Sequence, residues 1–392
     1  MTVSTTMDMI IRPANRLGST EEYYFSKKLR EIAQLRAQGQ DILNLGIGSP
    51  DLPPAPQVID RLNEVSRQAQ SHGYQSYIGR QELRQAMADW YLRYFGVQLD
   101  SSAGEILPLI GSKEGIMHIS MAFLNPGDEV LVPNPGYPTY RSATELAGGV
   151  VRPYILEDEN NWLPDLAALA KTDLSKVKIM WVNYPHMPTG TPADPAFFRE
   201  LVDFALAHEI LLVNDNPYAF ILTEERHSLL AVAGAKQVVL ELNSLSKAQN
   251  MAGWRIGMLA GAAEYLQTVL RFKSNMDSGK FLGLQLAAVE ALQLGPEWYQ
   301  QLNTTYRQRR EIARQIMQRL DCDFRQDQVG LFIWAKVPQG KTGYELSDEL
   351  LYDKQLFITP GGIFGNQGEN YLRISLCSNQ EQLLAALGRI EP

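Results

Sequence analysis

The chain has 392 residues, and 36 Lys and Arg against 44 Asp and Glu give it a formal net charge of −8. This length predicts two or three domains around a substantial core. The acidic balance excludes a general nucleic-acid or anionic-membrane binder, because both kinds of partner select basic patches. With two cysteines, no basic signal start and no run of about 18 apolar residues, the sequence predicts a cytoplasmic protein without disulfides or membrane spans.

Apolar spacing predicts the elements in chain order. Tyr24, Phe25, Leu29, Ile32 and Leu35 recur at helical spacing and predict a helix before Gly39. Short apolar runs alternating with amphipathic segments then predict strands joined by crossover helices, which is typical of a mostly parallel sheet. The predicted strands cover residues 106–110, 129–132, 150–155, 177–182, 210–214, 238–242 and 256–260, and the clearest helix covers residues 112–124.

The C-terminal part has a different pattern. Residues 301–320 form a long charged amphipathic helix, and strands at 331–337 and 371–376 bracket a helix at 344–352. We therefore predict an α/β fold: a central, mostly parallel seven-stranded sheet domain and a smaller α+β domain made from both termini. The expected boundaries are residues 1–60 for an N-terminal arm and part of the small domain, 61–290 for the large domain and 291–392 for the rest.

The most informative motif follows the strand at 238–242. Ser244, Ser246 and Lys247 come directly after it, and Arg255 lies eight residues beyond the lysine. Burial beside cationic groups lowers the pKa of a lysine and leaves its amine available for Schiff-base formation. The arginine and the hydroxyls are suited to binding a phosphate. A surface loop with an unremarkable Lys and Arg is the alternative.

Three further loops follow predicted strands. The segment 111–116 begins a helix, where backbone N–H groups can bind an anion, although a helix capped by Ser112 explains it equally well. Asp215 and Tyr218 suit the ring nitrogen and phenolic oxygen of a pyridoxal cofactor, or a simple turn. Tyr137 could stack on a flat cofactor or pack in a rigid loop. Since ligands bind at the carboxyl ends of strands in open α/β sheets, these loops together favour a cofactor site.

In order and spacing, these residues resemble the class I/II pyridoxal-phosphate aminotransferases of fold type I. The resemblance covers most of the chain, from about Tyr23 onward. Its motifs are residues 45–51, Tyr74 with Gly79 and Arg84, residues 111–116, 134–138 and 185–190, Asp215 with Tyr218, residues 244–247 with Arg255, and residues 371–375. Within the family, the segments that begin at Tyr23, Gly111 and Lys273 look most similar to the group of LL-diaminopimelate, succinyldiaminopimelate and alanine-type aminotransferases.

The resemblance implies the role of each residue around the cofactor ring. Lys247 forms the aldimine with pyridoxal 5′-phosphate and moves the proton between the substrate Cα and the cofactor. Asp215 keeps the pyridine nitrogen protonated, Tyr218 binds the ring oxygen and Tyr137 stacks on the ring.

The resemblance also implies the two anion sites. The phosphate is held by Ser112, Lys113, Ser244, Ser246 and Arg255, with Tyr74 reaching in from a neighbouring subunit, so that the active unit is a homodimer. Arg373 binds the substrate carboxylate with help from Gly48, and Tyr23, Tyr24 and Ile47 line the substrate pocket.

One position departs from the family. Met187 replaces the asparagine of the usual Asn-Pro-Thr-Gly motif and cannot donate a hydrogen bond to the ring oxygen. Either Asn183 or His186 substitutes, or Tyr218 alone holds this oxygen, which would alter the pKa of the bound cofactor.

The expected reaction is ping-pong transfer of an amino group between an L-amino acid and a 2-oxo acid, with glutamate and 2-oxoglutarate as one pair. A C–S β-lyase or related α,β-elimination enzyme is the alternative, because the same fold and lysine serve both. Lys280 could meet a distal substrate carboxylate, but we favour a solvated lysine there. The five histidines show no metal-ligand spacing, so no metal is expected.

Overall fold

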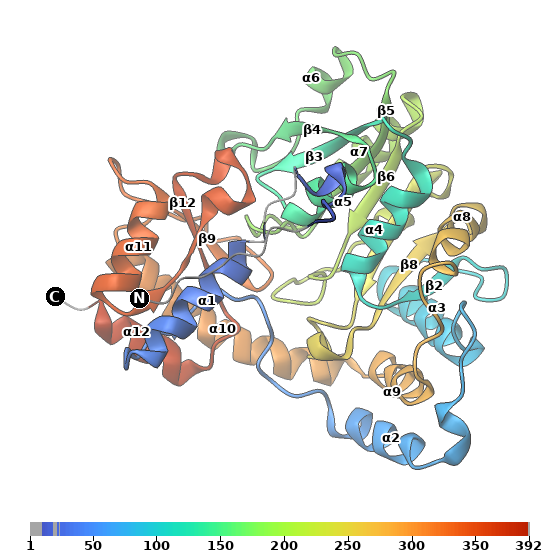
Figure 1. The fold of residues 1–392 in the computed structure, drawn as a ribbon, viewed down its shortest axis with the longest axis horizontal. Coiled ribbons are helices and arrows are strands. Elements are labelled where there is room, and N and C mark those ends of the chain that lie inside the picture. Colours follow the sequence, from blue (N-terminus) through green and yellow to red (C-terminus); the bar gives the residue numbers. More distant parts are fainter. Residues whose placement is uncertain (1–9, 19–21, 23, 391–392) are drawn as a thin grey trace.

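The computed structural model describes residues 10–18, 22 and 24–390. A large sheet with helices on both faces forms one part of the molecule, and a smaller group of helices and strands from both ends of the chain lies beside it (Figure 1). Tyr23 lies outside the described residues. The boundaries at residues 60 and 290 stay predictions.

The large sheet has seven strands in the order β2-β8-β7-β6-β5-β3-β4. Strand β8 runs antiparallel to its neighbours β2 and β7, and the other pairs are parallel. The strands are β2 (Ile106–Leu109), β3 (Glu129–Asn134), β4 (Val150–Ile155), β5 (Val177–Val182), β6 (Leu211–Asp215), β7 (Val239–Ser244) and β8 (Gly257–Gly261). Every end lies within two residues of its predicted position, so the α/β fold with a mostly parallel seven-stranded sheet is confirmed.

Both faces of this sheet are buried, which explains why its strands are almost continuously apolar. Ile179 and Trp181 of β5 join the core on one face, whereas Met180 and Val182 join the core on the other. Helices α4 (Ser112–Phe123), α5 (Pro138–Leu146) and α8 (Ala263–Lys273) cover the first face. Helices α3 (Gln81–Phe95) and α7 (Pro195–Ala207) contribute to the second.

The strand directions gather the loops that carry the predicted site residues. Strands β2, β3, β5, β6 and β7 all end at the same edge of the sheet, because they share one direction. Strand β8 runs the opposite way and therefore begins at that edge, directly after Arg255. Residues far apart in the chain thus meet at one edge.

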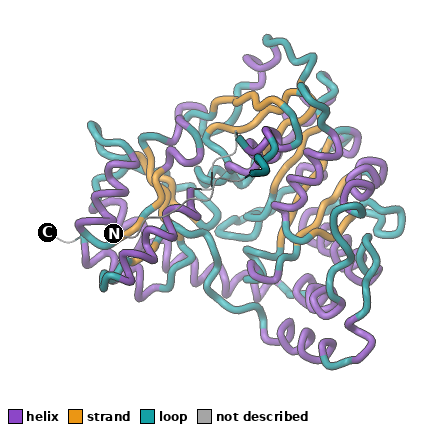
Figure 2. The backbone as a smooth tube through the Cα atoms, viewed as in Figure 1, coloured by secondary structure: helices purple, strands orange, loops and turns teal. Residues whose placement is uncertain are grey.

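The smaller part combines both ends of the chain. Strand β1 (Leu43–Asn44) pairs with β10 (Leu356–Phe357), and the order β11-β12-β9 forms a three-stranded antiparallel sheet. Its strands are β9 (Phe332–Lys336), β11 (Thr359–Pro360) and β12 (Tyr371–Ser375). Helices α1 (Tyr24–Ala37), α10 (Pro296–Arg319), α11 (Gly343–Asp353) and α12 (Gln380–Arg389) complete it, as the tube in Figure 2 shows.

Three α-helices of the described residues remain. Helix α2 (Pro56–Ser66) packs against α9 (Leu282–Leu292), which also contacts α3, and α6 (Leu166–Ala170) packs against α7. Within the described residues, no helix combines the length and apolar character that crossing a membrane requires.

Candidate active site

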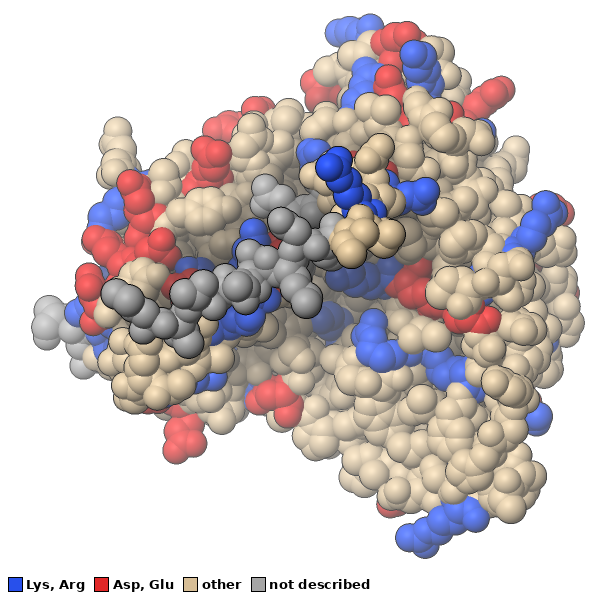
Figure 3. Space-filling model, in the orientation of Figure 1, with Lys and Arg blue, Asp and Glu red and all other residues tan. Residues whose placement is uncertain are grey.

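A cavity of about 440 Å³ lies where the strand ends of the large sheet meet the small sheet. In Figure 3, blue Lys and Arg side chains lie in the hollow in the middle of the molecule. The predicted residues that line the cavity are Ile47, Gly48, Ser112, Lys113, Tyr137, Asn183, Asp215, Tyr218, Ser244, Ser246, Lys247, Arg255 and Arg373. The structure therefore brings together almost the whole predicted site.

Lys247 lies in the turn after β7, at the bottom of this cavity. Its Nζ donates a hydrogen bond to the Gly48 carbonyl oxygen at 2.7 Å. Burial lowers the pKa of Lys247, and the positive charges of Arg373 and Arg255 lower it further. Gly48 fits here because it has no Cβ, since a Cβ at this position would overlap the Phe332 ring. The amine is thus held in a desolvated site, which favours its neutral, nucleophilic form.

Asp215 is the last residue of β6 and is buried. Its Oδ2 accepts a hydrogen bond from the Tyr140 hydroxyl at 3.1 Å, whereas its Oδ1 has no hydrogen-bond partner among the described residues. Burial raises the pKa of Asp215 to about 7, against the opposing effects of Tyr140 and Lys247. The structure thus presents a buried carboxylate oxygen that needs a donor or a positive charge.

Tyr140 is a site residue that no sequence motif had indicated. It follows Tyr137 on the first turn of α5, and its ring stacks on Trp181 with centroids 5.1 Å apart. The stack sets the hydroxyl of Tyr140 toward Asp215. The available signal was that Tyr140 lies three positions after Tyr137, a predicted cofactor residue. Its partner Asp215, however, is 75 residues away in the chain.

The loops before α4 and β8 form one polar end of the cavity. Gly111 has a positive φ of 83°, and a Cβ there would overlap the Arg255 guanidinium. Ser112 does not cap α4, because Gly111 occupies the N-cap position and the Ser112 hydroxyl donates to the Asn243 carbonyl at 3.2 Å. The capping alternative for Ser112 is therefore wrong. The first turn of α4 begins beside Arg255, and a helix N-terminus next to a guanidinium is what an anion site requires.

Two hydroxyls extend this polar end. Ser244 donates to Ser246 with 2.8 Å between the oxygens, and both line the cavity. Burial lowers the pKa of Lys113, and Arg255 adds to this effect. Several donors and positive charges are therefore concentrated in one place, which suits a dianion.

Arg373 occupies the opposite end and comes from β12 of the small sheet. Its Nη2 donates to the Gly46 carbonyl at 2.8 Å, and its Nη1 lies 3.3 Å from the Met187 sulfur. The guanidinium carbon lies 3.9 Å from the Phe332 ring centroid and 4.7 Å from that of Phe364. Aromatic faces pack on the guanidinium, and Arg373 lines the cavity, an arrangement suited to a carboxylate.

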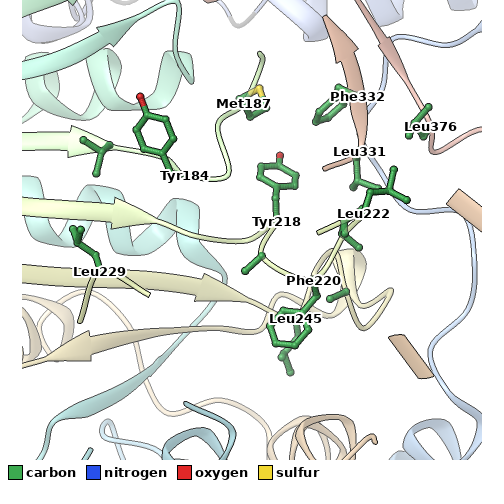
Figure 4. Packing of buried hydrophobic residues seen from close by; sticks show 14 of the residues in the cluster. Tyr184, Met187, Tyr218, Phe220, Leu222, Leu229, Leu245, Leu331, Phe332 and Leu376 are labelled. Atoms are coloured by element: carbon green, nitrogen blue, oxygen red, sulfur yellow. The ribbon is translucent and has the colours of Figure 1, made fainter. Parts of the chain in front are cut away.

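Met187 sits between the two ends. Figure 4 shows Met187, Tyr218 and Phe332 around one space, with the Tyr218 hydroxyl directed between the other two side chains. All three line the cavity. Met187 therefore fills part of the wall with a thioether that donates no hydrogen bond.

The two candidate substitutes for the missing asparagine differ. Asn183 lines the cavity, but its amide nitrogen donates to the Asp215 carbonyl and its Oδ1 accepts from the Met187 N–H at 2.8 Å. His186 is absent from the cavity lining and pairs with the Thr189 hydroxyl at 2.8 Å. Burial lowers the pKa of His186 to about 3. Tyr218 is thus the hydroxyl donor that faces the space beside Met187.

Three predicted residues lie elsewhere. Tyr74 is 95% exposed and does not reach the cavity of its own chain. Tyr24 packs edge to face on Tyr344 and does not line the cavity, whereas its neighbour Phe25 does. The prediction that Lys280 is solvated is wrong, because its Nζ donates to the carbonyls of Leu109 and Arg255, each at 2.6 Å. The adjacent Gly279 forms an isolated antiparallel β-bridge with Gln75.

One group of metal-ligand side chains exists among the described residues. The ligand atoms of Glu114, His118 and Asp277 lie within 4.8 Å of one another. These groups already have partners of their own: Glu114 bonds His118 at 2.7 Å and the Ile110 N–H, and Asp277 pairs with Lys273 at 2.7 Å. The cluster is therefore a hydrogen-bonded ion network under α4. The spacing of Glu114 and His118, four residues apart on a helix, was a signal that the sequence analysis missed.

The site and sheet define a pyridoxal-phosphate enzyme of fold type I, and comparison with known proteins specifies the family. The family model described as aminotransferase class I and II matches residues 40–390. The chain is 40% identical over 380 residues to LL-diaminopimelate aminotransferase from Aquifex aeolicus, covering 96% of this chain and 98% of that one. It therefore belongs to the class I and II aminotransferases.

Solved structures agree. The substrate-bound BacF structure from Bacillus subtilis has a TM-score of 0.92 and 35% identity, covering 97% of each chain. A probable N-succinyldiaminopimelate aminotransferase from Thermus thermophilus has a TM-score of 0.86 and 32% identity, covering 93% of this chain and 98% of that one. The protein is a pyridoxal-phosphate-dependent aminotransferase that transfers an amino group between an amino acid and a 2-oxo acid.

The residues present fit this cofactor. The unpartnered Asp215 Oδ1 suits a protonated pyridine nitrogen, and Lys247 offers a buried amine. The first turn of α4 and Arg255 form a cradle that a side chain at Gly111 would fill. Carboxylate, amine and anion site thus occur in one cavity.

Proposed function

We propose that this aminotransferase uses glutamate and 2-oxoglutarate as one substrate pair, and that Lys247 carries the reacting proton. The observation that supports this most strongly is the position of Lys247, between a buried carboxylate on one side and Arg373 on the other. When bound, pyridoxal phosphate supplies an electron sink for the negative charge that develops on the substrate Cα. Lys247 Nζ would take the proton from the substrate Cα and deliver it to the cofactor C4′ carbon, which is the proton movement that amino transfer requires.

The remaining residues bind and orient the cofactor. We assign Asp215 Oδ1 to the pyridine nitrogen, with Tyr140 fixing the carboxylate through Oδ2. Tyr218 donates its hydroxyl to the ring oxygen, and Tyr137 covers the ring. The phosphate is bound by the N–H groups at Ser112 and Lys113, by the hydroxyls of Ser244 and Ser246, and by Arg255.

Arg373 binds the substrate α-carboxylate. Its weak contact with the Met187 sulfur can be exchanged for a charge-assisted pair with a carboxylate, while its bond to the Gly46 carbonyl preserves its orientation. The Gly48 carbonyl is 2.7 Å from the Lys247 amine, so this backbone segment borders the reacting centre. Ile47 lines the substrate side.

The donor is proposed to be a dicarboxylic amino acid of the type named for the relatives, such as LL-diaminopimelate. Among the described residues that line the cavity, the cations are Lys113, Lys247, Arg255 and Arg373, and each already has a role above. We therefore place the partner of a distal carboxylate on a second subunit. The fully exposed Tyr74 supports this homodimer, because a phosphate contact would give its hydroxyl a partner.

The buried, unpaired cysteines Cys322 and Cys377 support a reducing, cytoplasmic location.

The test is a titration of the purified protein with amino acids, monitored through its visible absorption spectrum. Glutamate, alanine, methionine and LL-diaminopimelate are added in turn, and 2-oxoglutarate is then added to reverse the change. Loss of the aldehyde-form band with glutamate and its recovery with 2-oxoglutarate support the proposal. Cystathionine, which carries sulfur on Cβ, is added in a separate sample, and release of ammonia and pyruvate from it would instead identify the β-lyase alternative. A mass of one chain in light scattering would overturn the shared site.

A further inference from the structure

Lys280 lies under the polar end of the cavity without lining it. Its Nζ donates to the Leu109 carbonyl at 2.6 Å and to the Arg255 carbonyl at 2.6 Å. Leu109 is the last residue of β2, two positions before Gly111. One ammonium group therefore joins the two chain segments that bear the proposed phosphate donors, although these segments are 146 residues apart in the sequence.

Other groups hold the same turn. The Ile110 N–H donates to Glu114, and the Ile110 carbonyl accepts from Arg255 Nη2 at 3.5 Å. The Arg255 backbone has a positive φ of 57°, a conformation that costs free energy in a residue with a side chain and needs support from its surroundings. Lys280 supplies such support through the Arg255 carbonyl, so its removal would release both the arginine backbone and the end of β2.

The surroundings of Lys280 are charged on several elements. Glu114 of α4 and Asp277 before Gly279 favour its positive form, whereas Lys273 of α8 and Arg255 oppose it. Glu114 is itself bonded to His118. Burial is the largest effect and lowers the pKa of Lys280 to about 7. A dianion bound at the cradle favours the charged form of this lysine.

We propose that Lys280 is a positioning residue that fixes Arg255 and the Gly111 turn in the geometry that binds a phosphate group. This inference rests on the proposed placement of the cofactor phosphate at these two loops. It assigns to Lys280 a role in selecting the phosphorylated cofactor over the same ring without phosphate, and not a role in binding substrate.

The first test compares the dissociation constants of pyridoxal phosphate and pyridoxal for the wild type and Lys280→Met. Loss of two charge-assisted hydrogen bonds should weaken pyridoxal phosphate about tenfold and leave pyridoxal nearly unchanged. Lys236→Met is the matched control, because Lys236 also donates to a backbone carbonyl, that of Gln98, away from the cavity. Cooperative melting of Lys280→Met without cofactor would show that the variant is folded. In such a protein, equal loss of affinity for both ligands, or no loss for either, would overturn the inference.

A second variant gives an independent readout if Lys280→Met does not fold. Lys280→Arg keeps a charge that does not titrate near neutrality. In the wild type the affinity for pyridoxal phosphate relative to pyridoxal should fall between pH 7 and 9, by up to about tenfold per pH unit, because binding takes up a proton. The arginine variant should show no such fall. The same pH slope in both proteins would contradict the role of Lys280.

Arg255→Met separates this inference from the placement on which it rests. If Arg255→Met loses affinity for pyridoxal phosphate and Lys280→Met does not, the phosphate site stands and the inference about Lys280 fails. If neither substitution changes the preference for the phosphorylated ligand, the proposed phosphate placement itself is wrong.

Discussion

The two ends of the cavity are built in different ways. The phosphate end is built at one edge of the large sheet, and backbone carbonyls and hydroxyls hold its residues, which are Gly111, Ser112, Ser244, Ser246 and Arg255. At the carboxylate end, Arg373 comes from the small sheet and is held by a carbonyl, a thioether and aromatic rings. The strand order thus defines the first end, whereas the second depends on how the two sheets meet.

This difference indicates how the site can vary. Polar bonds with fixed directions hold the phosphate end, so a substitution there leaves buried groups without partners. Aromatic faces and a methionine hold the carboxylate end, and such contacts tolerate a shift of the arginine. We therefore expect substitutions at the cofactor end to abolish function and those at the substrate end to change affinity.

The largest expected effect comes from Lys247. Lys247→Arg keeps the positive charge but provides no amine of suitable pKa to form a Schiff base or move the proton, so the turnover number should fall by about 10⁴-fold. Stopped-flow measurement of the half-reaction with glutamate checks this. A Lys247→Arg variant that retains a tenth of the activity would contradict the assignment.

Asp215 should make the stability of the cofactor-free protein depend on pH. Its pKa rises from 3.8 to about 7 on folding, so between these pH values the folded state holds a proton that the unfolded state has released. The contribution of Asp215 to the free energy of unfolding is therefore full below pH 4. It is lost as the pH rises to 7, and the loss is no more than about 4 kcal/mol.

Urea unfolding of the wild type and Asp215→Asn at a series of pH values measures this contribution as a difference. Adding pyridoxal phosphate should abolish the decline, because a protonated ring nitrogen stabilises the ionised carboxylate. Parallel pH profiles of the two cofactor-free proteins would show that Asp215 is not the titrating group.

Arg373→Lys tests the opposite end. A lysine cannot form the two parallel hydrogen bonds of a guanidinium with a carboxylate and loses the stacking on Phe332, so KM for glutamate should rise about 10²-fold. The turnover number at saturation should change less. Steady-state kinetics separates the two quantities, and a fall in the turnover number alone would place Arg373 in the chemical step instead.

The smallest effect is expected at Met187, between the two ends. Met187→Asn supplies a second donor to the cofactor oxygen beside Tyr218 and should lower the pH midpoint of the visible absorption by about one unit. Met187→Leu is the control and should keep the wild-type midpoint. A midpoint unmoved by the asparagine would mean that position 187 does not contact this oxygen.

The phosphate end could be predicted from sequence to a large extent. Apolar runs located each strand of the large sheet, and Gly111, Asp215 and Lys247 lie at strand ends or shortly after them, so local pattern was sufficient. The hydrogen bond from Tyr140 to Asp215 could not be predicted, because the two residues are 75 positions apart in the chain. The hydrogen bonds of Lys280 could not be predicted either, because the carbonyls of Leu109 and Arg255 lie 171 and 25 positions away from it. Such contacts depend on tertiary packing rather than on spacing.

The carboxylate end was harder to predict from the sequence. Arg373 was identified through its motif, but the rings of Phe332 and Phe364 around it, and the Met187 sulfur beside it, come from three separate segments. An apolar residue in a strand is predicted equally well as core, so nothing local marks Phe332 as part of a substrate site.

The central claim is that Lys247 is the amine to which the cofactor attaches, and chemical mapping tests it most directly. The protein with pyridoxal phosphate is reduced with borohydride, which makes the link between amine and cofactor permanent, and is then digested and analysed by mass spectrometry. The account predicts the added mass on the peptide that contains Lys247. Added mass on Lys113, which lines the same cavity, with Lys247 unmodified would contradict it.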